Sequence, residues 1–584
     1  MLTTESCNDR IHTVTSDRRQ RSRFFLMLNH FEAHRRFYNR SIMGYLDLID
    51  RDKNSPYYGT IPNCWSLINE GSYYFVPPIV IVEGYYTEGS PIYRNQEYLE
   101  LACESIESAQ RFIHEDGSMD MKTTNFHDPA FVAFTVRDSL GPMAAILDLH
   151  SKHTPTEERL SALCLSTLKK LSNALKHLGF HTANHRWLIS SALAFVYRYL
   201  HDDEALETLN RFLSEGIDCD EFGEYTERSA GTYNMVCDEA FFNMGEVLGD
   251  QSFFDMPYRN LKLMHSFFEP DGTVFTDNSL RQDHGKRHIS DEYYHFYLGM
   301  AIVRRDGEFA YYADRMLKNI LAEEVKNENF GGITMRILNW ALMHPEWEAI
   351  QAEVEPVKPT REQSIFLEKS GLVRLYHENT TLSIIKSHRE NFLKFQFGDT
   401  FFYLRCASSF FGQPHSQFRA AELVKDGESY VLSSEEHAGY RSQFDEPPET
   451  SDYHLMDHSK RHMINVQTLK TEIRITPKGR GFSLDLLTSG TPQVPNKLDI
   501  LLPAKGRFES DSLFTDAKEG LDLLLMSDCS VFYTYNTRLK ISCPKSRHYY
   551  FKDMRGSEPV PDNYFVLTVT GYSEEPMHFE FTLD

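Results

Sequence analysis

The sequence predicts a multidomain α+β protein, with an N-terminal α/α toroid followed by a C-terminal antiparallel β-sandwich. Three observations predict this fold. In residues 95–345 the apolar side chains recur at the period of an α-helix. In residues 366–584 the period changes to two, as in half-buried strands. Residues 346–365 are polar with two prolines, which is typical of a linker.

The helices of residues 95–345 are expected to alternate between outer and inner positions. Residues 165–180 carry leucines three and four positions apart, which predicts an amphipathic helix with one exposed face. Residues 185–200 are apolar almost all round, so we expect a helix that is buried on every side. Residues 202–217 are amphipathic again, and Asp202 or Asp203 is expected to cap that helix. This alternation suggests a toroid whose inner-helix ends line a central cleft.

The strands of the second half lie between short runs of Gly, Asn, Asp and Pro, which is typical of an antiparallel sandwich. We expect strands within residues 370–388, 393–406, 471–488, 496–506, 521–535 and 562–572. Residues 1–94 are less regular. Aromatic, Pro-rich and Gly-rich segments such as residues 73–91 are expected to pack on the toroid.

The composition restricts the partners. The formal net charge is -23, and no basic block is present, so the chain does not look like a nucleic-acid binder. No apolar run reaches about 18 residues, which argues against a membrane span. An acidic glycan is not excluded, because charge repulsion is screened within about 8 Å at physiological salt and a locally basic cleft can still bind it.

The cysteines and the N-terminus indicate the compartment. The nine cysteines form no CxxC pair or regular framework, as expected in a reducing environment. Residues 1–25 contain no apolar core of a signal peptide. We therefore expect a cytoplasmic protein. Its oligomeric state, a homo-oligomer included, stays open.

The candidate catalytic residues lie in three short stretches. Asn184-His185-Arg186-Trp187 opens an expected inner helix. About fifty residues later, the stretch of residues 224–233 ends at Tyr233, and Gly412-Gln413-Pro414-His415 follows much further along the chain. These stretches supply an amide, imidazoles, guanidinium groups and phenols but no carboxylate nucleophile. That set suits proton transfer on an acidic sugar better than hydrolysis of a neutral one.

Further polar residues are candidates for substrate binding. In residues 124–131, Asn125 and His127 stand at the start of an expected inner helix. A second group is the most basic local segment of the chain, so it suits an anionic sugar. Its members are Arg281, His284, Lys286, Arg287 and His288. The full set of expected substrate-binding residues is Arg186, Tyr225, Arg228, Asn125, His127 and His284.

A toroid, a sandwich and these motifs together resemble polysaccharide lyases of the heparinase II/III-like and alginate-lyase-like type. The resemblance matches Asn184 and His185 to the family's Asn-His pair. It matches Tyr233 to the tyrosine after an Arg-Ser stretch, and His415 to the histidine of the sandwich. It implies a lyase that acts on an acidic oligosaccharide or polysaccharide.

The implied reaction is β-elimination on a 4-linked uronate. Asn184 and His415 would neutralise the sugar carboxylate, because hydrogen-bond donors stabilise an enolate-like state. Tyr233 would remove the C5 proton and protonate the leaving oxygen, with Arg228 or a protonated histidine as its nearby cation. His185 is the base if the elimination is anti. Tyr225 is a rival of Tyr233 for the proton-transfer role.

The sequence predicts no cofactor and no catalytic metal. Such lyases often hold zinc in the sandwich through a second histidine two residues after the first, and here Ser416-Gln417 follows His415. The histidines and aspartates further on are more simply surface-loop residues, although they could form another site. They are His437, Asp452, His454, Asp457, His458 and His462.

Three other functions stay open. A glycoside hydrolase on a toroid would need two acids about 5 to 10 Å apart across the scissile bond. The acids available to it are Asp220, Glu221, Glu224, Glu227 and Asp277. A uronate C5-epimerase would share the proton abstraction without expelling a leaving group. A non-catalytic glycan-binding protein would need neither paired acids nor a proton-abstracting base. The fold alone does not distinguish these functions.

Overall fold

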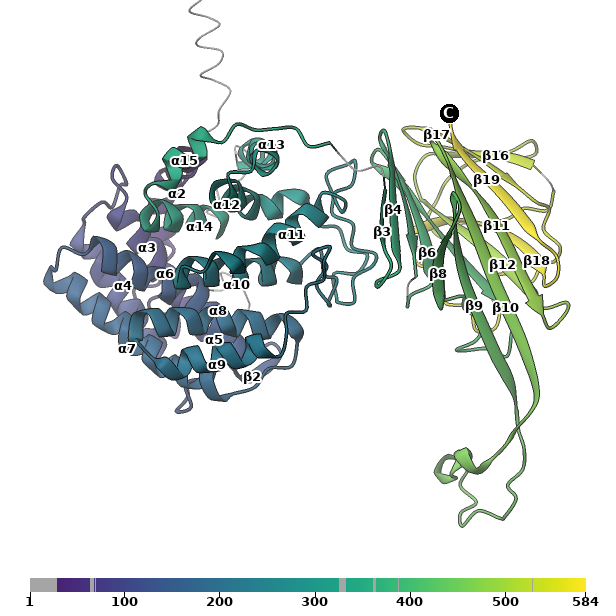
Figure 1. The fold of residues 1–584 in the computed structure, drawn as a ribbon, viewed down its shortest axis with the longest axis horizontal. Helices are drawn as coiled ribbons and strands as arrows, with labels where there is room; N and C mark the ends of the chain where they lie inside the picture. Colours follow the sequence, from purple (N-terminus) through teal and green to yellow (C-terminus); the bar gives the residue numbers. More distant parts are fainter. Residues whose placement is uncertain are drawn as a thin grey trace, which may run out of the picture. The chain divides into compact units, whose positions relative to one another are not determined.

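The computed structural model describes residues 29–62, 68, 70–324, 332–360, 364–386, 388–527 and 529–584. The chain forms two compact units. Unit 1 comprises Met1–His265 and Ser279–Thr360, and unit 2 comprises Ser266–Asn278 and Arg361–Asp584. The helices of unit 1 run from purple to teal in Figure 1, and the strands of unit 2 from green to yellow. A helical part followed by a β-sandwich is therefore confirmed at the level of fold class.

Unit 1 is built from helices and one small hairpin. The helices are α2 (His30–Asp47), α3 (Val76–Tyr86), α4 (Gln96–Ala109), α5 (Pro129–Thr135), α6 (Gly141–His150), α7 (Pro155–His177), α8 (Ala183–Leu200), α9 (Asp203–Ser214), α10 (Tyr233–Leu248), α11 (Asp255–Met264), α12 (Tyr294–Arg304), α13 (Gly307–Glu324), α14 (Gly332–Met343) and α15 (Trp347–Glu353). The hairpin pairs β1 (Met119–Met121) with β2 (Asn125–Asp128). Helix α15 lies within the predicted linker of residues 346–365.

The predicted alternation of amphipathic and buried helices is present from α7 to α9. Helix α7 begins earlier than its leucine pattern, at a capping box in which Thr154 and Glu157 bond reciprocally. Helix α8 is buried continuously from Trp187 to Val196. Helix α9 is amphipathic, and Asp202 caps it by accepting a hydrogen bond from Ala205 N at 3.2 Å. The cap is thus Asp202 rather than Asp203.

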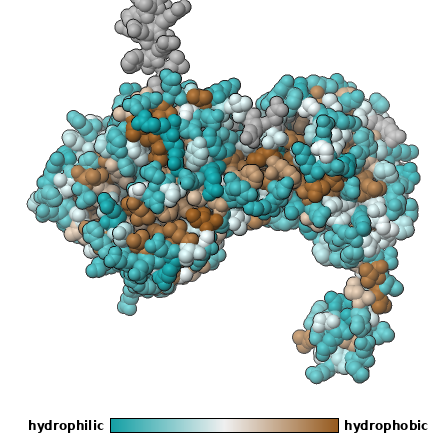
Figure 2. Space-filling view, in the orientation of Figure 1, coloured by the Kyte–Doolittle hydropathy of each residue, from teal (hydrophilic) through white to brown (hydrophobic). Residues whose placement is uncertain are grey.

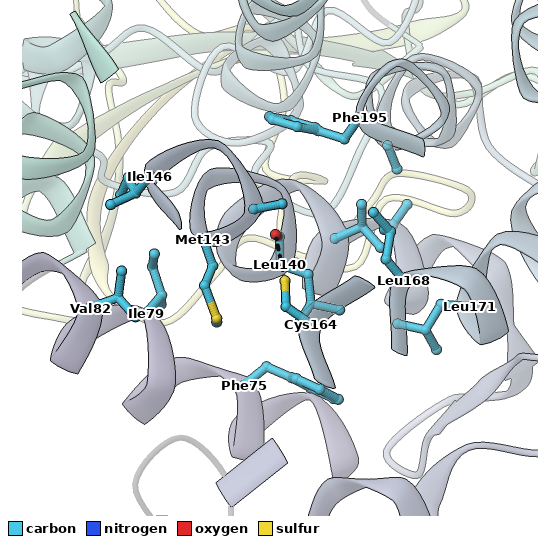
Figure 3. Packing of buried hydrophobic residues seen from close by; sticks show 14 of the residues in the cluster. Phe75, Ile79, Val82, Leu140, Met143, Ile146, Cys164, Leu168, Leu171 and Phe195 are labelled. Atoms are coloured by element: carbon cyan, nitrogen blue, oxygen red, sulfur yellow. Dashed lines mark hydrogen bonds between the residues drawn. The ribbon is translucent and has the colours of Figure 1, made fainter. Parts of the chain in front are cut away.

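Helix α3 belongs to the core of unit 1 rather than to a loosely packed outer layer. Its residues from Pro77 to Tyr86 are all buried. Two prolines stand in its first turn, where the missing N–H groups cost no helical hydrogen bond. Figure 3 shows Ile79 and Val82 of α3 near Met143 of α6 in one packed cluster. The N-terminal part of the chain therefore contributes directly to this core.

One stretch of unit 1 is long and apolar enough to cross a membrane, by length and composition alone. It runs from Pro129 to His150, and 89% of its most apolar window is buried inside the protein. A core helix of a soluble protein passes the same test, so this is weak evidence for a span. The visible surface in Figure 2 is mostly hydrophilic, with scattered hydrophobic patches.

Five of the described cysteines fit the expectation of unpaired thiols. Cys103, Cys164, Cys219, Cys237 and Cys406 form no disulfide. Burial raises the pKa of the Cys164 thiol to about 12, and its sulfur donates to the Leu140 carbonyl at 3.4 Å (Figure 3). Cys7 and Cys64 lie outside the described residues. The reducing compartment stays a prediction.

Unit 2 consists of two facing sheets around one apolar core. Among the described residues, one sheet has nine strands in the order β14-β13-β16-β17-β19-β11-β10-β9-β8, and the other has eight in the order β15-β18-β12-β7-β6-β5-β4-β3. All described pairings within these two sheets are antiparallel except that of β15 with β18. The strands are β3 (Ser364–Leu367), β4 (Leu372–His377), β5 (Thr380–Ile385), β6 (Asn391–Phe397), β7 (Thr400–Ser408), β8 (Glu422–Asp426), β9 (Ser429–Arg441), β10 (Met463–Lys478), β11 (Gly481–Gly490), β12 (Pro495–Pro503), β13 (Arg507–Glu509), β14 (Phe514–Asp516), β15 (Asp522–Leu524), β16 (Cys529–Thr534), β17 (Arg538–Cys543), β18 (Tyr564–Tyr572) and β19 (Met577–Leu583).

Segment Ser266–Asn278 belongs to unit 2 although helices of unit 1 flank it in the sequence. Arg374 of β4 fixes it, because its guanidinium donates to the Ser266 carbonyl at 2.8 Å and to Glu269 at 3.1 Å. Lys394 of β6 lies 3.6 Å from Glu269 and 3.5 Å from Asp277. Burial alone would raise the pKa of Glu269, but the two cations hold it below the usual value. The sequence analysis did not foresee this segment of unit 2.

Candidate functional site

The Asn-His pair stands at the start of α8, as the sequence predicted. Asn184 is fully buried. Its amide nitrogen donates to Glu227 Oε2 at 2.8 Å and to Thr182 Oγ1 at 3.3 Å. Its amide oxygen is buried without a hydrogen-bond partner. Both amide hydrogens are therefore already used by the protein, and Asn184 serves first to hold Glu227 in place.

His185 is half-buried, and its environment keeps the imidazole neutral. Burial is the largest effect, and it lowers the pKa of His185 to about 4. The charge of Asp128 acts in the opposite direction, whereas His181 and Arg281 lower the pKa further. The Nδ1 atom is buried without a hydrogen-bond partner. At neutral pH His185 thus offers an unprotonated nitrogen, as a general base requires.

Tyr233 begins α10 and lies against a cation. The guanidinium carbon of Arg281 is 4.5 Å from the centre of the Tyr233 ring, which is cation–π geometry. Arg281 also forms an ion pair with Glu227. Gln282 donates to the Tyr233 hydroxyl. Glu227 therefore connects Asn184 of α8 to Arg281, and Arg281 connects to the phenol of α10.

Asp283 fixes the turn that leads into Tyr233. Its carboxylate accepts hydrogen bonds from Ser229 Oγ at 2.8 Å and from the backbone nitrogen of Gly231 at 2.9 Å. Ser229 Oγ in turn accepts from Tyr233 N at 3.0 Å. A Cβ on Gly231 would come within 2.5 Å of the His288 ring, so the close approach requires glycine. Asp283 is not among the residues predicted from the sequence.

Several residues predicted to bind substrate have structural partners instead. Tyr225 is buried and donates its hydroxyl to Asp238 at 2.9 Å, which leaves it no access to a ligand. Arg186 pairs with Glu215 at 3.0 Å and with Asp218 at 3.1 Å. Both residues thus have partners within the protein, and a role of Arg186 in substrate binding stays a prediction.

The remaining candidates lie in loops and in the hairpin. Arg228 adopts a left-handed backbone conformation with φ of 52°, in the turn before Tyr233. His284 Nδ1 lies 3.2 Å from the Ser279 carbonyl oxygen. Asn125 is in β2 and donates to Asp128 at 2.8 Å, and His127 is exposed beside Asp116. Their binding roles stay predictions.

His415 belongs to unit 2, in the turn that follows Pro414. Its Nδ1 lies 2.7 Å from Glu436 Oε2 of β9, so a carboxylate orients the ring. Within unit 1 the structure joins Asn184 to Tyr233 through Glu227 and Arg281, and the charge of Arg281 also acts on His185. That His415 completes this group stays a prediction.

The acids proposed for a hydrolase have other uses. Glu227 is neutralised by Arg281 and Asn184. Asp277 is in unit 2, where it accepts a hydrogen bond from Tyr403 at 2.8 Å. Asp220 accepts from the backbone nitrogens of Phe222 and Glu224, both at 2.9 Å. These three carboxylates hold local structure.

A cavity of about 490 Å³ opens beside the first turns of α10, α12 and α14. Arg137, Glu239 and Arg336 line it, and both arginines are ion-paired with Glu239. Three buried polar atoms at its wall have no hydrogen-bond partner, namely Arg137 Nη1, His295 Nδ1 and Asn339 Oδ1. The cavity is therefore lined by charged side chains that are largely paired with one another.

Comparisons with known proteins identify the fold. No family model matches the chain, and no curated protein matches it. Among solved structures, heparinase III is 12% identical with a TM-score of 0.51, over 91% of this chain and 77% of that one. A xanthan lyase from Paenibacillus is 10% identical with a TM-score of 0.56, over 94% of this chain and 57% of that one.

A chondroitin AC lyase from Streptomyces coelicolor is 9% identical with a TM-score of 0.51, over 95% of this chain and 77% of that one. At these identities the likeness concerns the fold alone. The chain therefore has the fold of polysaccharide lyases, and the resemblance stated from the sequence is confirmed at that level.

Proposed function

We propose that this protein is a polysaccharide lyase that cleaves a uronate-containing glycan by β-elimination. The observation that carries the proposal is the Tyr233 phenol packed against Arg281, with neutral His185 on the adjacent inner helix. This arrangement supplies a proton-transfer group, a second base and a fixed positive charge. The fold shared with lyases of acidic glycans supports it, and we infer that the helices of unit 1 form an α/α toroid.

In the proposed reaction, Tyr233 or His185 removes the proton at C5 of the uronate. The electron pair forms the C4–C5 double bond, and the bond from C4 to the bridging oxygen breaks. Tyr233 returns a proton to that oxygen. We propose that Arg281, although ion-paired with Glu227, stabilises the developing negative charge, as preorganised charges do most effectively. In this scheme Asn184 is a positioning residue that acts through Glu227.

The cavity beside α10 supports a subsite for a neighbouring sugar ring. Its volume of about 490 Å³ lies in the range of small-ligand pockets. Its lining of Arg137, Glu239 and Arg336 offers charged groups to sugar hydroxyls. We propose an oligosaccharide substrate bound partly in this cavity. The cytoplasmic location, and hence an imported oligosaccharide, stays a prediction.

The test of function is a panel of acidic glycans followed by ultraviolet absorbance, because only β-elimination leaves a conjugated unsaturated product. The matched control is the same glycan with its uronates reduced to neutral sugars. We expect cleavage of the acidic form alone, since the reduced form has no carboxylate to acidify C5. Products with saturated ends would show hydrolysis and contradict the proposal. An inverted C5 without cleavage would instead show an epimerase.

The pH dependence of turnover tests the role of His185. With a pKa of about 4, His185 is neutral from about pH 5 upward. The kcat/KM of the protein should therefore fall only near pH 4. An ordinary histidine would lose activity near pH 6.5. The measurement is kcat/KM against pH for the wild-type protein and for His185→Gln, which should lack the limb near pH 4. His177→Gln, at an exposed position of α7, is the control and should keep it. A wild-type limb near 6.5 would contradict this role.

A further inference from the structure

Residues 114–127 of unit 1 gather two imidazoles and a carboxylate at one point. His114, Asp120 and His127 each offer one ligand atom, and these atoms lie within 4.8 Å of one another. His114 Nε2 is 2.9 Å from Asp120 Oδ1. The rings of His114 and His127 are stacked, with centroids 4.0 Å apart. The three potential ligands therefore come from one short stretch of the chain and lie close together.

The backbone holds the three residues in this arrangement. In the hairpin, β1 pairs with β2, and the backbone nitrogen of His127 donates to Asp120 Oδ1 at 2.9 Å. His127 takes a left-handed conformation with φ of 49°, which costs free energy in a non-glycine residue. The His114 N–H donates to the Ser118 carbonyl at 2.9 Å and closes the preceding turn.

The same turn is fastened to α7. A Cβ on Gly117 would come within 2.2 Å of the Lys170 carbonyl oxygen, so glycine is required for this contact. Asn173 of α7 donates to the Asp116 carbonyl at 2.8 Å. The cluster is thus attached to a long helix of the core. A ligand would not have to order this segment on binding, so it would not lose affinity to that entropic cost.

We propose that His114, Asp120 and His127 bind a divalent transition-metal ion, with Zn²⁺ as the best fit. Two imidazole nitrogens and one carboxylate oxygen are a donor set that zinc accepts, with a fourth position left open. Bonds of about 2.0 to 2.2 Å in a tetrahedron place ligand atoms about 3.3 Å apart. The ligand atoms lie within 4.8 Å of one another, and the stacked rings of His114 and His127 must turn out of parallel for both nitrogens to point at one ion.

Asp116 completes the surroundings of the ion. Its Oδ2 lies 2.8 Å from His127 Nδ1. A metal-bound histidine usually donates its other ring nitrogen to such a carboxylate, which fixes the ring and strengthens the ligand. Ser118 Oγ, 2.9 Å from the same Nδ1 and 2.6 Å from Asp116 Oδ1, adds a second polar contact.

The bound ion would clamp the hairpin rather than take part in proton transfer. The hairpin ends at Asp128, which caps α5 by accepting from Ala130 N at 2.8 Å. The charge of Asp128 also acts on His185. The metal therefore further stabilises a hairpin that is already held in place, and it is a different site from the zinc site of related lyases, whose second histidine is absent after His415.

The experiment is a Zn²⁺ titration of the whole protein after removal of metals, followed by calorimetry and a competing chelator dye. We expect one saturable site and a rise in the thermal unfolding temperature. His114→Ala and His127→Asn should weaken binding by about a hundredfold or more, because losing only an outer partner costs about 10–100-fold. Asparagine suits the left-handed backbone at position 127. His153→Asn, at an exposed position of the same unit that is also left-handed with φ of 57°, is the matched control and should bind like the wild type.

Two results would overturn the proposal. One is the absence of saturable Zn²⁺ binding by the wild-type protein. The other is binding that survives both His114→Ala and His127→Asn unchanged, which would place the ion elsewhere. The test does not depend on lyase activity, so its outcome stands whether or not the proposed reaction is correct. His114→Gln, which keeps the side-chain volume, separates a lost ligand from a disturbed fold.

Discussion

Tyr233→Phe is expected to reduce turnover by about a hundredfold to ten-thousandfold, because the reaction loses the hydroxyl that moves its proton. The fold should persist, since the lost contact is a hydrogen bond from the exposed Gln282, worth about 0.5 to 1.5 kcal/mol at most. The ring keeps its place against Arg281. The measurement is the initial rate of unsaturated product on an active acidic glycan, with substrate affinity determined separately.

Tyr225→Phe is the control for this experiment. It removes a buried hydroxyl that donates to Asp238, so it should lower stability by about 1 to 3 kcal/mol while turnover is largely retained. The opposite pattern, a full-rate Tyr233→Phe and an inactive Tyr225→Phe, would transfer the proton-transfer role to Tyr225. Loss of activity in both variants, with folding intact, would mean that neither phenol acts alone.

The largest stability effect is expected for Arg374→Met in unit 2. The substitution leaves Glu269 charged and buried, with only Lys394 at 3.6 Å to compensate it. Removing one partner of a buried ion pair typically costs about 3 to 5 kcal/mol. The measurement is the unfolding transition of unit 2, followed by hydrogen exchange of its strands. Arg474→Ala, which removes an exposed ion pair with Asp426, should cost less than about 1 kcal/mol.

A double variant tests whether the stability lost in Arg374→Met comes from the unpaired charge of Glu269. Arg374→Met combined with Glu269→Gln removes both charges, so it should cost clearly less than Arg374→Met alone. Equal costs would mean that packing against Phe275, 4.1 Å from the guanidinium, dominates instead. The pKa of Glu269 also determines the pH range in which this ion pair stabilises unit 2. Because it is lowered in the folded state, its stabilisation is present above the unfolded value of about 4.5 and is lost as pH falls through the folded value.

The parts of the fold that the sequence predicted are those with a local period. Helices α7 to α9 and the strands β4 to β7 follow apolar patterns that can be counted within one segment. Helix α3 was not recognised, because it is apolar on every side and contains two prolines, which a periodicity argument does not associate with a helix. Segment Ser266–Asn278 was assigned with its neighbours, because its place in unit 2 depends on side chains of β4 and β6.

The candidate site shows the same limit. Asn184, His185 and Tyr233 could be proposed from the sequence because they stand at helix starts in a recognisable order. The sequence analysis placed Glu227 among possible hydrolase acids and Arg281 in a basic loop. Their connection joins residues 54 apart and follows no spacing rule. Asp283, which supports the turn before Tyr233, left no signal of its own in the sequence.

Unit 2 is built from two separate stretches of the chain, so its parts are synthesised at different times. Glu269 leaves the ribosome 105 residues ahead of Arg374. At about 5 to 20 residues per second, its carboxylate waits roughly 5 to 20 seconds for its partner. During that time segment Ser266–Asn278 must stay solvated while the rest of the helices are still being synthesised. A truncated chain that begins at Arg361 would never receive this segment, and Arg374 and Lys394 would lack the acids that neutralise them.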